Sequence, residues 1–213
     1  MKALVTGATG FVGTHLVHAL RRAGWEVTAL VRSPAKAAER LGDGVTCLRG
    51  DLDTPAALAE GCAGATVVFH VAGLVAARSD AEFDAVNRQG TARLLTAARD
   101  AGVGRFLLVS SLAAGGPSRA GAPLSGGSHA SPVTAYGRSK LAAEQEVRSG
   151  GVPWTIVRPP TVYGPWDTEL LKAFRIVQRG IAPVFGDGSQ LLSAVFGPDL
   201  ADAMLAAAVA PAA

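Results

Sequence analysis

The chain has 213 residues, 49% of them hydrophobic and 17% charged, and a formal net charge of +3 at pH 7. This length suits one large domain, or one domain with part of a second, and the composition is typical of a globular α/β protein. No apolar run is long enough to span a membrane, and the apolar strand pattern begins at the first residues, so we expect a cytoplasmic protein without a signal peptide. The small, unclustered charge does not indicate nucleic-acid binding.

The first motif is the stretch Lys2–Gly13, in which an apolar run is followed by glycines at positions 7, 10 and 13 and then by a helical pattern. This order directs the free N–H groups and positive dipole end of the first helix at an anion. Gly7 permits a tight turn, Gly10 lets a diphosphate approach the backbone, and Gly13 lets the helix pack closely on the strand. The stretch therefore predicts a nucleotide site, the alternative being a glycine turn that serves loop geometry alone.

Apolar runs and helical patterns then alternate along the chain. Further strands are predicted at residues 25–31, 45–48, 65–71, 105–110 and 153–158, and helices at 34–41, 55–61, 81–101 and 135–148. Such alternation indicates right-handed crossovers and a doubly wound parallel sheet, an α/β fold with helices on both faces. Ligands of this fold bind beyond the carboxyl ends of the strands.

Three segments that follow strands are candidates for cofactor binding. Arg32 occupies the place where an acid would hold the ribose 2′-hydroxyl of NAD, and its charge would pair with a 2′-phosphate, which favours NADP; alternatively it is a solvated surface charge. Asp51 has two interpretations of equal weight, a carboxylate near the adenine amino group or a cap of the helix that begins at Pro55. The segment Val71–Gly73 supplies small residues beside which a cofactor could lie.

The candidate catalytic residues follow the strand at 105–110. Ser111 ends that strand, and Tyr136 and Lys140 are four residues apart, which puts them on one helix face. A neighbouring ammonium, helped by an oxidised nicotinamide, is expected to lower the pKa of the tyrosine and make it an acid–base group. Ser111 would donate a hydrogen bond to a carbonyl oxygen that gains charge during hydride transfer.

Taken together, these motifs resemble the extended class of the short-chain dehydrogenase/reductase superfamily, whose members include NAD(P)-dependent epimerases and dehydratases. The segments that carry the resemblance are Thr6–Gly13, Asp51-Leu52, His70–Gly73, Asn87 with Gly90-Thr91, Val109–Ser111, Tyr136–Lys140 and Arg158–Pro165.

The resemblance implies a Rossmann fold and a catalytic group of Ser111, Tyr136 and Lys140, with Asn87 as a supporting residue. It also implies that the segment 159–162 passes beside the nicotinamide, and that two copies of the chain pair through the helices of Asn87 and Tyr136. The expected cofactor-binding residues are Gly7, Thr9, Gly10, Phe11, Val12, Gly13, Arg32, Asp51, Leu52, Val71, Ala72, Gly73, Tyr136, Lys140, Pro159, Thr161 and Val162.

Two departures from the family pattern bear on function. Leu112 and Ala113 follow Ser111 where sugar-nucleotide dehydratases carry Asp and Glu, so that elimination lacks its acid–base pair. Extended members also continue well beyond residue 213, so we expect a dinucleotide-binding domain at 1–160 and a partial, truncated substrate-binding segment with a returning helix at 161–213. The residues of that segment that would touch substrate are Arg175, Phe185, Asp187 and Gln190, with surface positions as the alternative.

Three functions are consistent with the sequence. The first is an NADP-dependent oxidoreductase that interconverts a secondary alcohol and a ketone or aldehyde, with NAD as the alternative cofactor and Tyr136 as acid–base. The others are a nucleotide-sugar epimerase with tightly bound NAD and a non-catalytic cofactor sensor. No metal site is predicted, because His15 and His18 have no third ligand nearby and the two cysteines, Cys47 and Cys62, have no ligand spacing.

Overall fold

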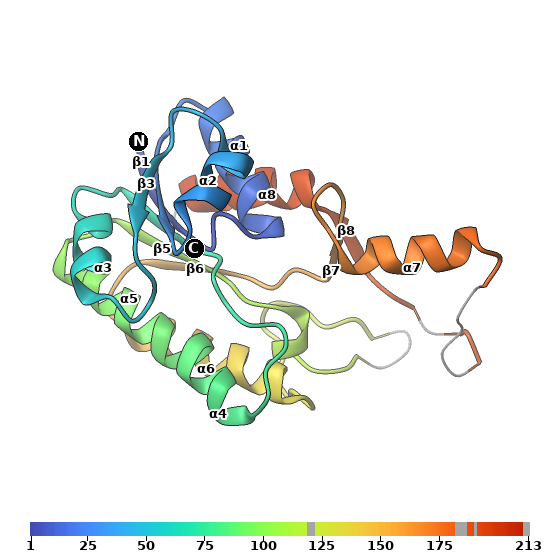
Figure 1. Ribbon diagram of the computed structural model, residues 1–213. Coiled ribbons are helices and arrows are strands. Elements are labelled where there is room, and N and C mark those ends of the chain that lie inside the picture. Colours follow the sequence, from blue (N-terminus) through green and yellow to red (C-terminus); the bar gives the residue numbers. More distant parts are fainter. Residues whose placement is uncertain (119–121, 182–186, 190, 211–213) are drawn as a thin grey trace.

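The computed structural model of the protein describes residues 1–118, 122–181, 187–189 and 191–210. Its main sheet has six parallel strands in the order β3-β2-β1-β4-β5-β6 (Figure 1). The strands are β1 (Lys2–Thr6), β2 (Glu26–Val31), β3 (Thr46–Arg49), β4 (Val67–His70), β5 (Arg105–Val109) and β6 (Trp154–Val157). The predicted doubly wound parallel sheet is confirmed.

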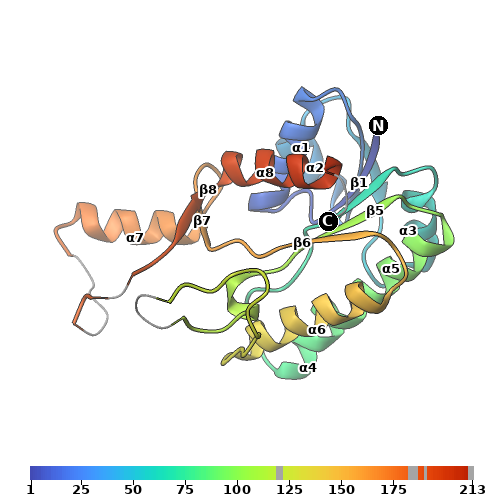
Figure 2. The same ribbon diagram turned by 180° about the vertical axis from the view of Figure 1, so that it is seen from behind.

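Helices cover both faces of this sheet (Figures 1 and 2). One face carries α1 (Phe11–Arg22), α2 (Pro34–Leu41) and α8 (Gly197–Val209), and the other carries α3 (Pro55–Cys62), α5 (Gly90–Asp100) and α6 (Ala135–Ser149). Successive strand residues alternate between the two cores: Val5 and Phe69 pack in the first, and Leu4 and Val68 in the second. Burial on both faces explains why these strands read as continuous apolar runs.

The helix predicted at 81–101 is not regular. It begins as α4 (Asp80–Phe83), continues as a π-helical segment at Asp84–Gln89 and becomes α5. Within the π-helical segment, the carbonyl oxygen of Asn87 accepts a hydrogen bond of 2.5 Å from the Thr91 hydroxyl. Periodicity predicted the extent of the helix but not this segment, which is of a kind often found at functional sites.

The last part of the chain leaves the sheet and returns to it. The strands β7 (Thr161–Tyr163) and β8 (Ala194–Phe196) form a parallel pair, from which α7 (Glu169–Gln178) projects away from the main body (Figures 1 and 2). No residue of α7 is buried, whereas α8 packs on α1 and adds Leu200 and Met204 to the core. Residues 175 and 187 are exposed in this region, and the predicted substrate contacts Phe185 and Gln190 lie outside the described residues.

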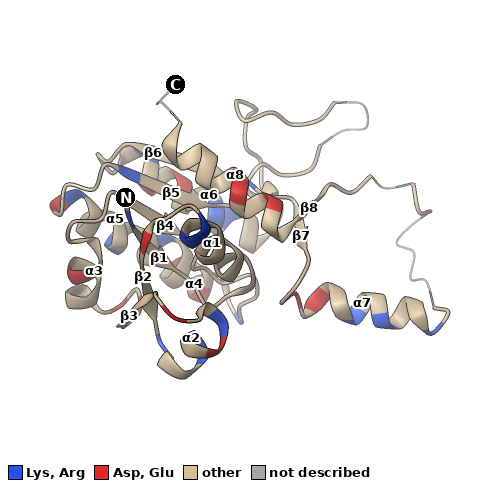
Figure 3. Cartoon of the chain, turned by 90° about the horizontal axis from the view of Figure 1, so that it is seen from above, with Lys and Arg blue, Asp and Glu red and all other residues tan. Residues whose placement is uncertain are grey.

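Charges of both signs are mixed on α2 and α7 (Figure 3). An ion pair of 2.9 Å between Arg22 and Asp202 joins α1 to α8. Among the described residues, none of the helices combines the length and the apolar character needed to cross a membrane.

The turn between β1 and α1 depends on the absence of side chains. Gly7 has φ +70°, and a Cβ atom there would lie 2.6 Å from the backbone nitrogen of Ala72. A Cβ atom on Gly13 would lie only 2.1 Å from the carbonyl oxygen of Gly7. The first helix can therefore approach the first strand this closely only with glycine at position 13.

A buried histidine links three elements of the core. The His70 side chain at the end of β4 lies 2.7 Å from the Thr6 hydroxyl of β1 through Nδ1 and 2.9 Å from the Thr91 hydroxyl of α5 through Nε2. Burial lowers the pKa of His70 from 6.5 to about 3, and the nearby charge of Lys140 acts in the same direction. His70 is therefore neutral in the folded protein at neutral pH.

We predict that Gly13→Ala lowers the free energy of unfolding by about 1–3 kcal/mol, because the added methyl group meets the Gly7 carbonyl. Urea unfolding measures this change. The control is Gly126→Ala, where a Cβ atom meets no other atom within 4 Å, and equal stability of the two variants would contradict the prediction.

A second prediction concerns pH. Because the unfolded chain protonates His70 near pH 6.5 and the folded chain only near 3, His70 contributes stability above pH 6.5 that is lost as the pH falls through this window. Between about pH 7 and pH 5, the stability of the parent should fall more steeply than that of His70→Gln, by up to about 1.4 kcal/mol per pH unit. Urea unfolding across this range tests it, and parallel slopes would contradict it.

Candidate active site

The carboxyl ends of β1, β4 and β5 bring the predicted site residues to one edge of the sheet. The segment after β4 contacts two of these residues. Ala72 lies against Gly7, and Gly73 lies beside Lys140, because a Cβ atom at position 73 would lie 3.5 Å from the Nζ of Lys140. The Ala72 amide also donates to the Thr6 hydroxyl at 3.3 Å. The glycine turn and the predicted catalytic lysine thus share one backbone segment as a neighbour.

The start of α1 fits an anionic group. Its N-cap is Gly10, which offers no side chain to the free amides, and its first turn contains no acidic residue. The Gly10 amide donates to the Gly7 carbonyl at 2.9 Å, and the Thr14 hydroxyl donates to the Gly10 carbonyl at 2.7 Å, so the turn is held from within. Phe11 and Val12 are half-buried at the helix start, and the Thr9 carbonyl accepts a hydrogen bond from Arg40 at 3.4 Å. A dinucleotide diphosphate fits this cradle.

The ends of β2 and β3 carry the residues expected near the adenosine. Arg32 is exposed, and its charge helps to lower the pKa of Asp51, although hydrogen bonds from Thr54 and from the Asp53 amide lower it more. Oδ1 of Asp51 accepts those two bonds at 2.8 and 3.0 Å. Both lie in the turn before α3 and neither comes from an amide of that helix, so these bonds are not the cap that one interpretation expected. The Leu52 side chain is buried, and it packs where a Cβ on residue 90 would lie.

The start of α6 lies against the turn that follows Ser111, where a Cβ atom at residue 137 would lie 2.3 Å from the Ala113 carbonyl oxygen. Burial raises the pKa of Tyr136, and the Ser111 hydroxyl nearby partly offsets this rise. The Ser111 side chain also caps a short 3₁₀ turn at Leu112–Ala114 by accepting from the Ala113 amide at 3.1 Å. The phenol ring packs at a tilt against the ring of buried Phe83, with 6.0 Å between centroids.

Lys140 is buried beside this pair. Its ammonium donates to the Val109 carbonyl at 2.7 Å, and burial lowers its pKa to about 8, against the opposite influence of Glu144. In this structure the largest cause of the pKa shift of Tyr136 is burial, and the Lys140 ammonium is held at the backbone of β5. That Lys140 and an oxidised nicotinamide together lower the pKa of Tyr136 stays a prediction. Lys140 remains mostly protonated at neutral pH.

The Asn87 side chain is occupied by structural bonds. Its Oδ1 accepts from the Leu74 amide at 2.7 Å, and its Nδ2 donates to the Leu74 carbonyl at 3.0 Å and to the Ser139 hydroxyl at 2.9 Å. Asn87 therefore holds the loop after β4 to α6, next to Lys140.

Sequence reasoning missed a buried ion pair behind the site. Glu144 is fully buried one turn beyond Lys140, where its carboxylate accepts from the Arg158 guanidinium at 2.7 and 2.6 Å and from the Ser110 hydroxyl at 2.6 Å. The sequence offers one signal for the burial of Glu144: it lies four positions after Lys140, and this spacing puts both side chains on the same face of the helix. The pair fixes α6 against the ends of β5 and β6.

The segment after β6 lies next to the residue that follows Ser111. Pro159 is buried, and its carbonyl accepts from the Leu112 amide at 3.0 Å. Thr161 and Val162 begin the β7 strand that pairs with β8. This contact brings the segment expected beside a nicotinamide to the same strand end as Ser111.

The other singled-out polar residues have structural partners. His15 and His18 lie within hydrogen-bond distance of the carbonyl oxygens of Pro165 and Arg40, at 2.9 and 3.2 Å. Cys47 is exposed, and Cys62 is buried with a raised pKa of about 11. Within the described ranges, no group of three or more His, Cys, Asp or Glu side chains is arranged to hold a metal ion.

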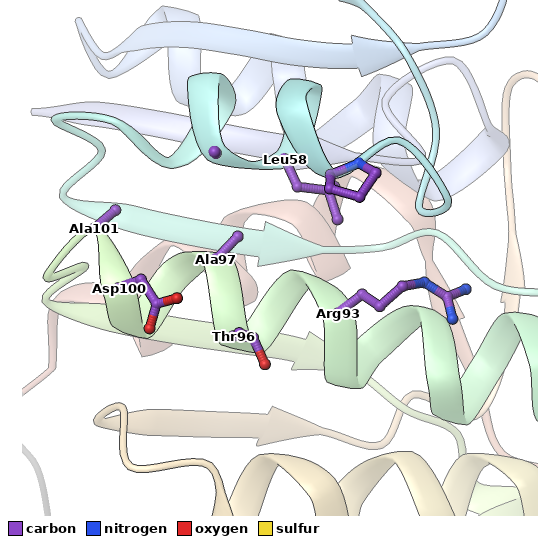
Figure 4. A pocket seen from close by; sticks show the side chains of 8 residues that line it. Leu58, Arg93, Thr96, Ala97, Asp100 and Ala101 are labelled. Carbon is purple, nitrogen blue, oxygen red and sulfur yellow. The ribbon is translucent and has the colours of Figure 1, made fainter.

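A cavity of about 510 Å³ lies elsewhere, between α3 and α5 (Figure 4). Leu58 and Ala97 point into it, and Arg93 and Asp100 lie toward its two ends. The Arg93 guanidinium is bound to the Leu52 carbonyl at 2.8 Å and to Asp53. None of the predicted site residues lines this cavity, so it is separate from the candidate active site.

Comparison with known proteins identifies the family of the chain. The model of the NAD dependent epimerase/dehydratase family matches residues 3–213. The chain is 42% identical over 188 residues to a ceramide reductase of Caulobacter vibrioides, which covers 88% of this chain and 55% of the relative. It is 32% identical over 199 residues to a UDP-glucose 4-epimerase of Vibrio cholerae, covering 88% of this chain and 60% of the relative.

The fold also matches solved structures. The structure of a UDP-glucose 4-epimerase of Thermus thermophilus in complex with NAD gives a TM-score of 0.86 at 27% identity, covering all of this chain and 76% of that one. The chain spans a little more than half the length of the two curated relatives above, 55% and 60%. The resemblance seen in the motifs is confirmed: the chain belongs to the NAD-dependent epimerase/dehydratase family of extended short-chain dehydrogenases/reductases.

Proposed function

We propose that the protein is an NADP-dependent oxidoreductase that interconverts a ketone and a secondary alcohol. The observation that supports the proposal is the placement of Ser111, Tyr136 and buried Lys140 at one strand end, at the sheet edge that also holds the glycine turn. Family members similar to this chain include a reductase and epimerases. In this proposal residues 1–160 bind the dinucleotide and the 161–196 segment contributes to substrate binding.

The proposed roles follow from the chemistry of the three side chains. A reduced nicotinamide, when bound, supplies the hydride that the carbonyl carbon receives. The Tyr136 hydroxyl then gives its proton to the carbonyl oxygen, and the Ser111 hydroxyl donates a hydrogen bond to that oxygen as charge develops on it. The Lys140 ammonium has three donors, one of them bound to Val109, which leaves others for ribose hydroxyls and for the tyrosinate.

The surface near this site favours a ketone with apolar substituents. Leu112 directly follows Ser111 and is 41% exposed, Val133 lies three residues before Tyr136 and is 70% exposed, and Val75 follows the Gly73 segment and is 77% exposed. Exposed apolar side chains of this kind gain from contact with an apolar ligand. The similarity to a ceramide reductase supports the same class of substrate.

A nucleotide-sugar epimerase is the second candidate, supported by the similarity to the Vibrio and Thermus enzymes. It would require NAD held through turnover and a site for a sugar diphosphate. Leu112 and Ala113, in place of an acidic pair, argue against elimination chemistry on the same site.

Two observations would favour the other candidate functions. NAD that stays bound through purification, with UDP-glucose raising the melting temperature, would favour the epimerase. Cofactor-dependent binding of a partner without turnover would favour the non-catalytic cofactor sensor.

We predict that Tyr136→Phe lowers turnover of a long-chain 2-ketone, such as 2-tridecanone with NADPH, by roughly 10²–10⁴-fold, because it removes the proton donor. NADPH binding, followed by its fluorescence, should be retained. The control is Trp154→Phe, which changes an exposed aromatic residue at the first position of β6, away from the carboxyl ends of the strands, and should leave turnover near that of the parent. Activity retained in Tyr136→Phe would refute the catalytic assignment.

The cofactor preference has its own test. We predict that the protein binds NADPH more tightly than NADH, and that Arg32→Ala reduces this preference roughly tenfold by removing a charge-assisted contact to the 2′-phosphate. Fluorescence titrations with both cofactors measure it. Arg99→Ala, which removes an exposed arginine of α5, serves as control, and an unchanged preference in Arg32→Ala would contradict the assignment.

A further inference from the structure

We propose that His70 is a positioning residue that joins the cofactor turn to the helix of Tyr136 and Lys140 through a chain of directed hydrogen bonds. The effect on catalysis rests on the proposed function, whereas the chain of hydrogen bonds itself is a property of the fold. His70 lies at the end of β4, the strand whose following segment contacts both Gly7 and Lys140.

The direction of each bond in this chain can be worked out from its fixed end. The Thr91 hydroxyl has a single proton, which it donates to the Asn87 carbonyl at 2.5 Å. Thr91 must therefore accept from Nε2–H of His70 at 2.9 Å. Since the buried imidazole is neutral, its Nδ1 is an acceptor and receives the proton of the Thr6 hydroxyl at 2.7 Å. Thr6 in turn accepts from the Ala72 amide at 3.3 Å.

The chain continues from Asn87 to the catalytic helix. The Asn87 side-chain amide donates to the Ser139 hydroxyl at 2.9 Å, and Ser139 donates to the backbone carbonyl of Tyr136 at 2.8 Å. One end of the chain therefore lies at the backbone that contacts Gly7, and the other at the backbone of Tyr136. The π-helical segment at Asp84–Gln89 lies between them.

Two features indicate that these hydrogen bonds fix the relative positions of the elements they join, in addition to filling space in the core. An apolar side chain at position 70 would leave the Thr6 and Thr91 hydroxyls without their buried partner. Reversal of the histidine tautomer would leave two acceptors, the bare Nε2 and the Thr91 hydroxyl oxygen, facing each other, so only one proton arrangement satisfies every member. A chain with one allowed arrangement holds β1, β4 and α5 at set distances.

The test changes Thr91, which lies outside the proposed catalytic group. Thr91→Val keeps the branched shape but removes the hydroxyl, and Thr91→Ser keeps the hydroxyl as a matched control. With NADPH and 2-tridecanone, we expect kcat of Thr91→Val to fall roughly tenfold, about 1.4 kcal/mol in activation free energy, while KM for NADPH changes less than about twofold. Thr91→Ser should stay within about twofold of the parent. A lower melting temperature for Thr91→Val with the parental kcat would overturn the proposal.

Two readouts do not need turnover. ¹⁵N NMR of the parent at neutral pH should show His70 protonated at Nε2 and bare at Nδ1, and the opposite tautomer or an imidazolium would overturn the chain. Amide hydrogen exchange at residues 137–140 should be faster in Thr91→Val than in the parent and Thr91→Ser, and equal exchange in all three would overturn the positioning role. If the parent protein does not turn over the ketone, the proposed function is refuted. The two measurements above still decide whether the chain of hydrogen bonds through His70 exists.

Discussion

The arrangement of the candidate site depends on one close backbone contact. The segment after β4 lies between the glycine turn and Lys140, so close that a side chain at Gly7 would collide with the backbone of Ala72. Parallel strands bring their carboxyl ends to one edge, but they do not by themselves bring a loop within contact of two neighbours. The absence of a side chain at Gly7 allows this contact, and the residues proposed for hydride chemistry lie around it.

Burial sets the electrostatics of the proposed catalytic group. It raises the pKa of Tyr136 and lowers that of Lys140 to about 8, so both groups are driven toward their neutral forms. The ion pair of Glu144 with Arg158 lies behind them, with the carboxylate fully buried and the guanidinium largely buried. Its hydrogen bonds offset part of the free-energy cost of removing both charges from water. The tyrosine therefore holds its proton in this structure, as a proton donor to a carbonyl oxygen must.

Much of the fold was accessible from the sequence because continuous apolar strands and glycine spacing report local constraints. The strands, the helices and the doubly wound order of the sheet follow from such patterns. The π-helical segment was not predictable, since it inserts no distinctive residue and depends on contacts of Asn87 and Thr91 with distant strands. Burial of Glu144 and the restraint of Lys140 by Val109 were missed for the same reason: each depends on a partner far away in sequence.

The region from Thr161 to Phe196 is described only in part, and it carries the exposed apolar helix α7. Leu112 and Val133 add exposed apolar surface close to Ser111 and Tyr136. These exposed apolar side chains are the part of the surface on which the proposal of a substrate with apolar groups rests.

The most direct test of the account is a crystal structure of the protein with NADP bound. We expect the diphosphate to be hydrogen-bonded to the first amides of α1, and the nicotinamide to lie between Pro159 and the Tyr136 hydroxyl. A dinucleotide bound away from the turn at Gly7–Gly13, or a nicotinamide remote from Tyr136, would contradict it.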